Sequence, residues 1–327
     1  MNPKLIIILV AAALAIAAPF FVYPVLLMTI LCFVIFACSF NLLLGYTGLL
    51  CFGHAMFFGG AAYITGQILK TTSISVEVAI LCGALAAGLL GLVIGQLSIR
   101  RQGIQFAMIT LAFSQLVYFV LLQMEFTGGE NGMQGIPRNP LFGLVEVRDS
   151  FSFYYVILAL SAVAVFAFYR IVHSPFGEVL KAIRDNEARV ESLGFDPEKF
   201  KLVAFTLSAT MAGLAGAMKA TVFQFATLTD LSWPVSGEVI LMTLLGGLGT
   251  LTGPMFGAAI IILMNDHLAG FGEWALIGQG VILLVVIVLF RRGFVGEIGA
   301  LMKYLARRGK KPSAALVTAK PVVEQSR

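Results

Sequence analysis

Charged residues are scarce in this chain of 327 residues. Asp, Glu, Lys and Arg together make up 12% of the sequence, whereas hydrophobic residues make up 59%. A soluble domain usually carries about 25% charged residues, which cover its surface. The scarcity therefore excludes an ordinary soluble domain and indicates a chain that lies in a lipid bilayer.

Residues suited to metal binding, disulfides and catalysis are also few. The chain has 3 histidines, and its 4 cysteines lie in or beside apolar runs without CxxC spacing, so no metal site is predicted. It has no GxxxxGKS or GxxxxGKT loop, no HExxH and no GxSxG, so we expect neither a bound cofactor nor an enzyme. The net charge of +5 fits the basic loops of a membrane protein, so nucleic acid is not a predicted partner. The cysteines are Cys32, Cys38, Cys51 and Cys82.

The long apolar runs indicate helices rather than strands. A helix needs about 20 apolar residues to cross a hydrocarbon core, and the run from Val281 to Phe290 is apolar on every face, unlike a barrel strand. Segment 237–268 is interrupted by glycines and Pro254, which predicts a broken or re-entrant segment. The fold class is therefore an all-α polytopic membrane protein with eight to ten transmembrane or re-entrant helices. The full spans are predicted near residues 5–22, 25–44, 50–69, 76–98, 104–123, 153–172, 201–223 and 274–291.

The positions of the basic residues predict the orientation. Lysines and arginines gather in the loop 173–200, at Arg100 and Arg101, and after Arg291. Such residues mark the cytoplasmic side of a membrane protein. We therefore expect both termini in the cytoplasm of a bacterial cell, with the chain in the inner membrane.

The same pattern predicts how the chain is organised. The membrane domain is expected to cover residues 1–300, with an irregular periplasmic loop at 124–152. Residues 301–327 are expected to form a basic, disordered cytoplasmic tail. Within the spans, Lys219 is expected to extend its ammonium group toward the outer membrane surface.

The segment 173–201 has the pattern of an amphipathic helix outside the membrane. Ser174 and Pro175 predict its start, and Gly194 followed by Pro197 predicts its end. Two interpretations are open: a solvated helical linker, or a docking helix whose apolar face enters a groove on a cytoplasmic partner. The regular apolar stripe favours docking. The stripe consists of Phe176, Leu180, Ile183, Val190 and Leu193.

Three stretches together resemble a known family. They are SPFGEVLKAIRDNEARVESLG in the loop just described, NLLLGYTGLLCFGHAMFFGGAAYITG at 41–66, and SGEVILMTLLGGLGTLTGPMFGAAI at 236–260. Their sequences and their order are similar to those of the LivH/LivM permeases of branched-chain amino acid ABC importers, and most closely to the LivM type. Cys51 departs from the small hydroxyl residue expected there.

The resemblance implies a permease subunit that works in a complex. It implies a second, LivH-type permease, two cytoplasmic ABC ATPase subunits that use ATP and Mg, and a periplasmic amino-acid-binding protein, with membrane lipid around the permeases. The loop 173–200 would then couple ATP hydrolysis to the membrane helices. The residues assigned to coupling are Ser174, Pro175, Phe176, Gly177, Leu180, Ala182, Ile183, Arg184, Asp185 and Gly194.

Glycine-rich stretches predict two breaks in the membrane helices. Broken helices expose backbone groups that can bind a substrate in transporters, but small residues also let helices pack closely, so both interpretations stay open. The residues assigned to a substrate path or helix break are Gly45, Gly48, Gly53, His54, Gly246, Gly247, Gly249 and Gly253.

The substrate class has alternatives. Related permeases import urea, short amides or other amino acids, so these compete with branched-chain amino acids. An ion-coupled secondary transporter would need carboxylates inside the membrane, and the spans carry almost none. An integral-membrane enzyme is disfavoured because the sequence lacks a polar catalytic cluster.

Overall fold

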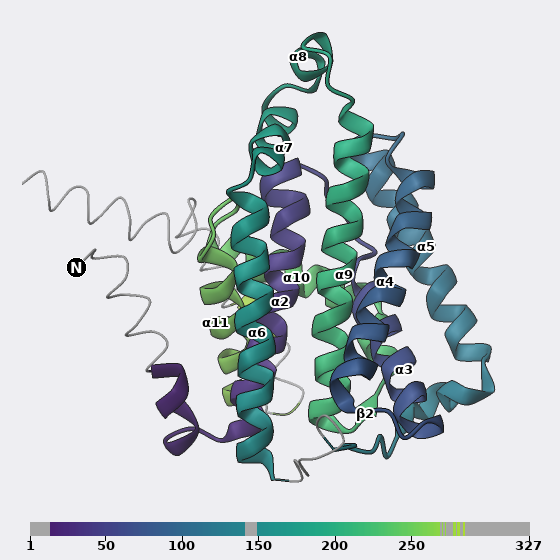
Figure 1. Cartoon of the computed structure of the whole chain (residues 1–327), viewed down its shortest axis with the longest axis vertical. Helices are drawn as coiled ribbons and strands as arrows, with labels where there is room; N and C mark the ends of the chain where they lie inside the picture. The colour runs from purple at the N-terminus through teal and green to yellow at the C-terminus, as the bar shows by residue number, and fades with distance from the viewer. Residues whose placement is uncertain are drawn as a thin grey trace, which may run out of the picture.

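The computed structural model describes residues 14–140 and 149–268, together with isolated positions between 270 and 284. Five helices are long and apolar enough to cross a membrane by length and composition, which confirms the prediction of an all-α polytopic membrane protein. Most of these helices run along the long axis of the molecule (Figure 1). The helices are η1 (Ala18–Phe20), α2 (Pro24–Asn41), the π-helix η2 (Leu42–Thr47), α3 (His54–Thr71), α4 (Val76–Ser98), α5 (Ile104–Gln123), η3 (Glu125–Thr127), η4 (Gly129–Asn131), α6 (Ser150–Val172), α7 (Pro175–Asp185), α8 (Glu187–Ser192), α9 (Pro197–Phe223), η5 (Leu228–Leu231), α10 (Trp233–Gly246) and α11 (Gly253–Leu268).

The predicted spans agree well with the helices that the structure describes. The bounds predicted for α4 and α5 match, and α6 and α9 begin three and four residues earlier than predicted. Asp196 explains the difference at α9, because its side chain caps the first turn of that helix and so extends it beyond its apolar part. Most of the predicted span 5–22, the predicted span 274–291 and the tail 301–327 lie outside the described residues.

Helix α9 lies at the centre of the helices and packs against α2, α3 and α4. Small residues make these contacts close. A Cβ atom added to Gly216 would lie 1.8 Å from the carbonyl oxygen of Phe58 on α3, and one added to Gly213 would lie 2.3 Å from Cβ of Ala87 on α4. Helices in lipid associate through such close packing rather than through hydrophobic burial. The glycines of α9 therefore serve packing.

We expect Gly216→Ala to lower the melting temperature of the purified protein, because the new methyl group overlaps the Phe58 carbonyl. Overpacking of this kind costs about 1–3 kcal/mol. Gly60→Ala is a matched control, since it also lies in a helix but an added Cβ meets nothing within 4 Å. Equal melting temperatures for the two variants, measured by thermal unfolding in detergent, would argue against close packing at Gly216.

The loop predicted at 124–152 is described as far as residue 140 and is held against the end of α9. Strand β1 (Met133–Gln134) pairs antiparallel with β2 (Phe225–Ala226), with Met133 opposite Ala226. Arg138 donates hydrogen bonds to the carbonyl oxygens of Thr221 and Val222, which end α9 without intrahelical partners. The loop thus closes one end of the molecule.

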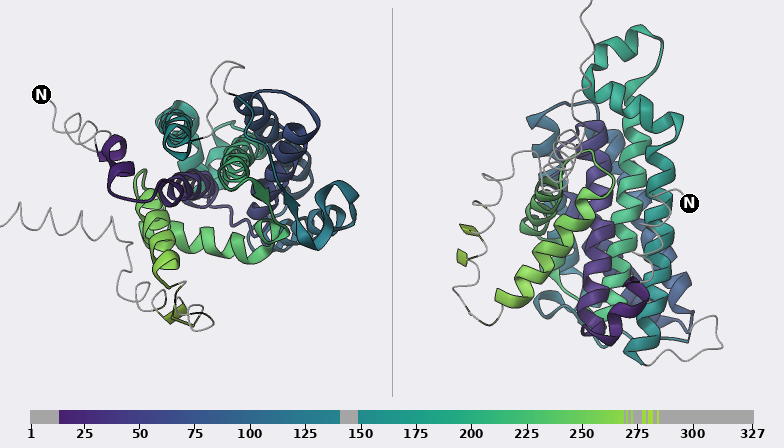
Figure 2. Two further views of the ribbon diagram at one scale, coloured as in Figure 1. Left: turned by 90° about the horizontal axis from the view of Figure 1, so that it is seen from below. Right: turned by 90° about the vertical axis from the view of Figure 1, so that its left-hand side faces the viewer.

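Helix α10 lies across the other helices instead of along them. Seen down the long axis, α2, α6 and α9 appear end-on, whereas α10 is seen from the side and meets α11 at its end (Figure 2). The two helices cross closely at glycines, because a Cβ on Gly246 would lie 1.9 Å from the Gly253 carbonyl oxygen. The segment 237–268 is therefore divided into two helices, and its re-entry into the membrane stays a prediction.

Candidate coupling site and helix breaks

The first break separates α2 from α3. Helix α2 widens into the π-helix η2 (Leu42–Thr47), and Gly48 then adopts a left-handed conformation with φ of 79°. π-helical turns are rare and often mark functional sites. The chain continues without helix until His54 begins α3, and the side chain of Ser236 on α10 accepts a hydrogen bond from the Ala55 N–H.

The second break separates α10 from α11. Gly247 and Gly249 have φ of 114° and 70°, which side chains with a Cβ rarely adopt. Thr250 then accepts a hydrogen bond from the Gly253 N–H and so caps the start of α11. The backbone conformation therefore requires Gly247 and Gly249, whereas Gly246 and Gly253 are required by the close approach of the two helices.

The two breaks meet at Asn41, the last residue of α2. Its side-chain oxygen accepts a hydrogen bond from the Gly249 N–H (3.0 Å), and its side-chain nitrogen donates to the Thr250 carbonyl (2.9 Å). Asn41 is fully buried. A Cβ on Gly45 would lie 2.6 Å from the Gly249 nitrogen, so the two backbones touch directly. We call Asn41, Gly45, Gly249 and Thr250 the break junction.

Helices α7 and α8 project beyond one end of the membrane helices (Figure 1). The Ser174 side chain caps α7 and Pro175 occupies its first turn, as the sequence predicts. A single helix was predicted here, but Asn186 is extended, ends α7 and caps α8. Gly194, with φ of 87°, follows the end of α8. Gly177 fits closely against α6, because a Cβ there would lie 2.3 Å from the Val172 carbonyl oxygen.

Arg184 of α7 connects this projecting unit to the break junction. Its Nη1 donates a hydrogen bond to the Gly45 carbonyl, and it lies 3.1 Å from the position of a Cβ on Gly249. Asp185 holds the guanidinium from outside, with Oδ1 3.2 Å from Nη2. Lys181, one turn earlier, lies over the Tyr46 ring at 5.8 Å. Helix α7 therefore contacts the first break directly and the second through the same guanidinium.

The apolar stripe of 173–201 points in a direction that the sequence did not predict. Leu180, Ile183 and Val190 are buried within this chain, so they do not form a free face for a partner. Helix α7 packs against η2, α6 and α9, and α8 packs against α9. The exposed apolar side chains are instead Leu193 and Phe195 at the end of α8, with 70% and 46% of their surface accessible.

The other residues assigned to coupling divide between the two faces of α7. Ala182 and Asp185 are exposed on its outer face. Phe176 is half-buried and stacks on Phe200 of α9 with ring centroids 5.8 Å apart. Phe176 thus ties α7 to the start of α9, while Ala182 and Asp185 remain accessible to another protein.

His54 lies at the first break but in the core. It is fully buried, and its Nε2 is 2.9 Å from the Ser39 hydroxyl, which itself donates to the Phe36 carbonyl. Nε2 therefore carries the proton and donates to Ser39. The ring also stacks on Phe36. This geometry favours the packing interpretation of His54 over a place on a substrate path.

Lys219 does not extend toward the membrane surface as predicted. Its ammonium forms an ion pair with Asp230 of η5, and the two side chains have 17% and 10% of their surface accessible. The rings of Phe33 and Phe58 lie under it at 5.7 and 5.6 Å. A buried cation needs such a partner. Sequence analysis missed the pair because η5 meets α9 only after the chain has turned at Gln224.

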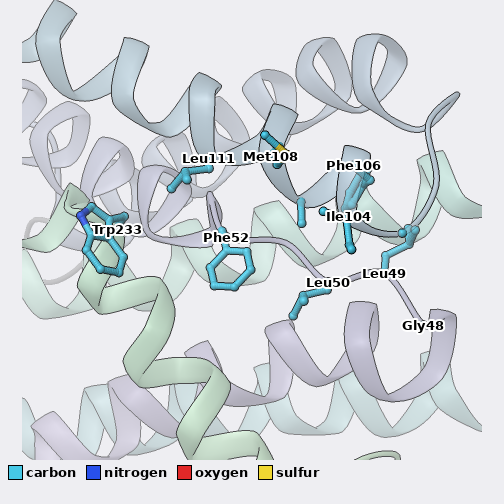
Figure 3. A pocket seen from close by; sticks show the side chains of 11 residues that line it. Gly48, Leu49, Leu50, Phe52, Ile104, Phe106, Met108, Leu111 and Trp233 are labelled. Atoms are coloured by element: carbon cyan, nitrogen blue, oxygen red, sulfur yellow. The ribbon is translucent and has the colours of Figure 1, made fainter.

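Two apolar cavities lie beside the first break. The smaller, of about 430 Å³, runs from Gly48 past Phe52 to Trp233 (Figure 3). The larger, of about 930 Å³, shares Leu50, Phe52 and Trp233 with it and follows α10. Among the residues assigned to a substrate path, Gly48 lines the smaller cavity. Substrate sites are commonly concave and mostly apolar, so these cavities are the best candidates for a path.

We expect Asn41→Leu to destabilise the protein strongly, because it leaves the Gly249 N–H and the Thr250 carbonyl buried without partners. Each such group costs about 1–3 kcal/mol. The matched control is Asn139→Leu, since Asn139 also donates to two carbonyl groups, those of Thr72 and Ile74, but does so near the surface. Melting temperatures that fall equally in both variants would contradict the role given to Asn41.

Comparisons with known proteins give a family match and several relatives. The family model described as "Branched-chain amino acid transport system / permease component" matches residues 22–290. The chain is 27% identical over 286 residues to the high-affinity branched-chain amino acid transport system permease protein LivM of Escherichia coli, covering 80% of this chain and 67% of that protein. Identity to LivM of Salmonella typhimurium is also 27%, over 86% of this chain and 72% of the relative. The ribose import permease protein RbsC of Escherichia coli is 25% identical over 71% of this chain and 75% of its own length. No solved structure matches.

Proposed function

Because the chain belongs to the branched-chain amino acid transport system permease family and is a multi-pass permease component of an ABC transporter, we propose that it imports branched-chain amino acids across the bacterial inner membrane. It would form the translocation path with a second, LivH-type permease. Two cytoplasmic ATPases would supply ATP hydrolysis, and a periplasmic binding protein would deliver the amino acid. Both termini would lie in the cytoplasm.

The observation that carries the proposal is the contact between α7 and the break junction. Helices α7 and α8 project from the membrane helices where an ATPase could reach them. Arg184 then joins α7 to Gly45, and Asn41 joins the first break to the second. A displacement of α7 by the ATPases would therefore move both breaks at once. Since a packed element has a few discrete arrangements rather than a continuum, such a displacement could switch the path between two states.

The lining of the cavities supports an aliphatic substrate. The larger cavity is lined by leucine, isoleucine, valine and aromatic side chains, with few polar groups. A sugar such as ribose presents hydroxyl groups that would lose their hydrogen bonds to water on such a surface. A leucine, isoleucine or valine side chain makes no hydrogen bonds to water that it could lose. The cavity therefore favours the branched-chain substrate over a sugar, urea or a short amide.

The proposal is tested by reconstituting the complete complex in liposomes with its binding protein and measuring the uptake of radiolabelled leucine. We expect uptake that requires ATP and the ATPases, with valine and isoleucine as competitors and ribose and urea without effect. Leucine uptake by the chain without ATPases would contradict ATP-driven import. Uptake of ribose or urea in place of leucine would contradict the substrate class.

A further inference from the structure

The larger cavity contains one acidic side chain in an otherwise apolar surface. Among its lining residues Glu238 alone has a carboxylate, and Asn265 lies beside it from α11. The remaining wall consists mainly of aliphatic and aromatic side chains. These are Leu44, Leu50, Phe52, Trp233, Val235, Ile240, Leu241, Leu244 and Leu248.

Glu238 and Asn265 present hydrogen-bond acceptors that the rest of the described chain does not use. The Asn265 side-chain nitrogen donates to Oε1 of Glu238 at 2.8 Å, and the side-chain oxygen of Asn265 is buried with no hydrogen-bond partner among the described residues. A carboxylate in the membrane part of a protein is costly unless a cation or a donor accompanies it. A carboxylate beside an unused acceptor fits a ligand that brings several donors and a positive charge.

Among the described residues, the cation whose charge acts on Glu238 is Lys219, which already has an ion-pair partner. Lys219 forms its ion pair with Asp230, so within the described residues Glu238 makes no ion pair of its own. The pair of Lys219 and Asp230 is neutral as a whole, because the charge of Asp230 opposes the effect of Lys219 on Glu238. Glu238 is half-buried and borders the open cavity, so a ligand can reach it. This arrangement differs from that of a carboxylate which serves only packing.

We infer that Glu238 and Asn265 bind the ammonium group of an α-amino acid with an apolar side chain as it passes along α10. An ammonium group has three N–H donors, which match the Glu238 carboxylate and the free oxygen of Asn265. The aliphatic side chain then lies on Leu241 and Leu244, the next turns of α10. The inference rests on the proposed function, because it assigns a substrate-contacting site to that transport path.

The orientation of the amino acid follows from the direction of α10. The cavity also includes Ser232 and Trp233, where α10 begins, and Ser232 makes no side-chain capping bond to the helix. Glu238 lies four residues after Pro234, which is about 6 Å along the helix axis. The helix dipole favours an anion at this end; it does so without free amide groups there, because Pro234 has no N–H and the Val235 N–H already donates to the Ser232 carbonyl. The carboxylate of the amino acid therefore points toward the start of α10 and its ammonium toward Glu238.

Glu238→Gln tests this site in the reconstituted complex. It keeps the size of the side chain and removes its charge, so we expect leucine uptake to fall about tenfold or more, the loss expected for a charged hydrogen bond. ATP hydrolysis stimulated by the binding protein should stay within about twofold, because the site contacts substrate rather than the ATPases. Glu238→Asp keeps the charge and should retain more uptake than Glu238→Gln. Asp266→Asn is the matched control, since Asp266 is exposed beside Asn265 and its loss should change neither activity.

The outcomes separate this site from the proposed function. If the wild-type complex takes up leucine and Glu238→Gln does so equally well, the proposed ammonium site is wrong, but the proposed function as an importer is still supported. If uptake, ATP hydrolysis and melting temperature all fall together in Glu238→Gln and Glu238→Asp, Glu238 is structural and the site is also wrong. If the wild-type complex itself takes up no leucine under ATP, the proposed function fails and the site fails with it.

Discussion

Arg184→Ala is expected to reduce ATP-driven leucine uptake about tenfold or more in the reconstituted complex, while ATP hydrolysis continues. The guanidinium is the direct hydrogen-bonding link from α7 to the Gly45 carbonyl, and it lies against Gly249 of the second break. A hydrogen bond to a charged group contributes about 1.5–3 kcal/mol, which corresponds to a change of tenfold or more in an equilibrium between two states. Without this hydrogen bond, a displacement of α7 would no longer move the two helix breaks. Uptake and hydrolysis are measured in the same vesicles.

Two further variants show whether the effect belongs to the link. Arg184→Lys keeps the charge but loses the planar fork that bonds Gly45 and Asp185 together, so we expect intermediate uptake. Arg101→Ala removes an exposed arginine from the loop between α4 and α5, at the same end of the molecule, and should leave uptake unchanged. If Arg184→Ala and Arg101→Ala transport leucine at the same rate, α7 does not act through Arg184.

The second large effect is expected at the end of α8. Leu193 and Phe195 are exposed apolar side chains on the projecting unit, and only one edge of the Phe195 ring is covered, by Phe200 at 6.0 Å. Exposed apolar groups of this kind mark contact sites for other proteins. The double substitution of Leu193 and Phe195 with Asp is therefore expected to abolish co-purification of the ATPases with the permease. Affinity purification of the permease followed by quantification of bound ATPase measures it.

The control for this interface is an exposed phenylalanine at the opposite end of the molecule. Phe126, in the loop that follows α5, is 41% accessible, and Phe126→Asp should leave ATPase binding unchanged. Leu180→Asp is not a suitable test, because Leu180 is fully buried and the variant would disturb the packing of α7 itself. Retention of the ATPases by the double variant at the level of wild type would show that they bind elsewhere.

Much of the fold could be predicted because lipid imposes simple constraints on a sequence. The apolar runs of α4 and α5 have their predicted bounds, since a helix that crosses a membrane begins and ends where polar residues begin. Local signals were equally informative outside the membrane. Ser174 and Pro175 begin α7, and the glycines of 246–253 mark a break in the helix.

The site itself depends on contacts between distant segments, which periodicity does not reveal. Asn41 joins the two breaks, but its partners at Gly249 and Thr250 lie more than 200 positions away in the sequence. The stripe of Leu180 and Ile183 was correctly predicted to be apolar. Periodicity does not say whether the rest of this chain or a partner protein covers it. Lys219 shows the same limit, because its partner Asp230 lies on η5, which packs mainly against α3 and reaches α9 through this ion pair.

The central claim is that movement of α7 reaches the second break through Arg184, and a single cysteine at Leu248 tests it most directly. Leu248 is 42% accessible, lies between Gly247 and Gly249, and borders the larger cavity. In the complete complex, the labelling rate of Leu248→Cys by a maleimide should change severalfold when ATP is trapped with vanadate, with the unsubstituted complex correcting for Cys82. In the Arg184→Ala background that change should disappear. An equal change with and without Arg184 would contradict the claim.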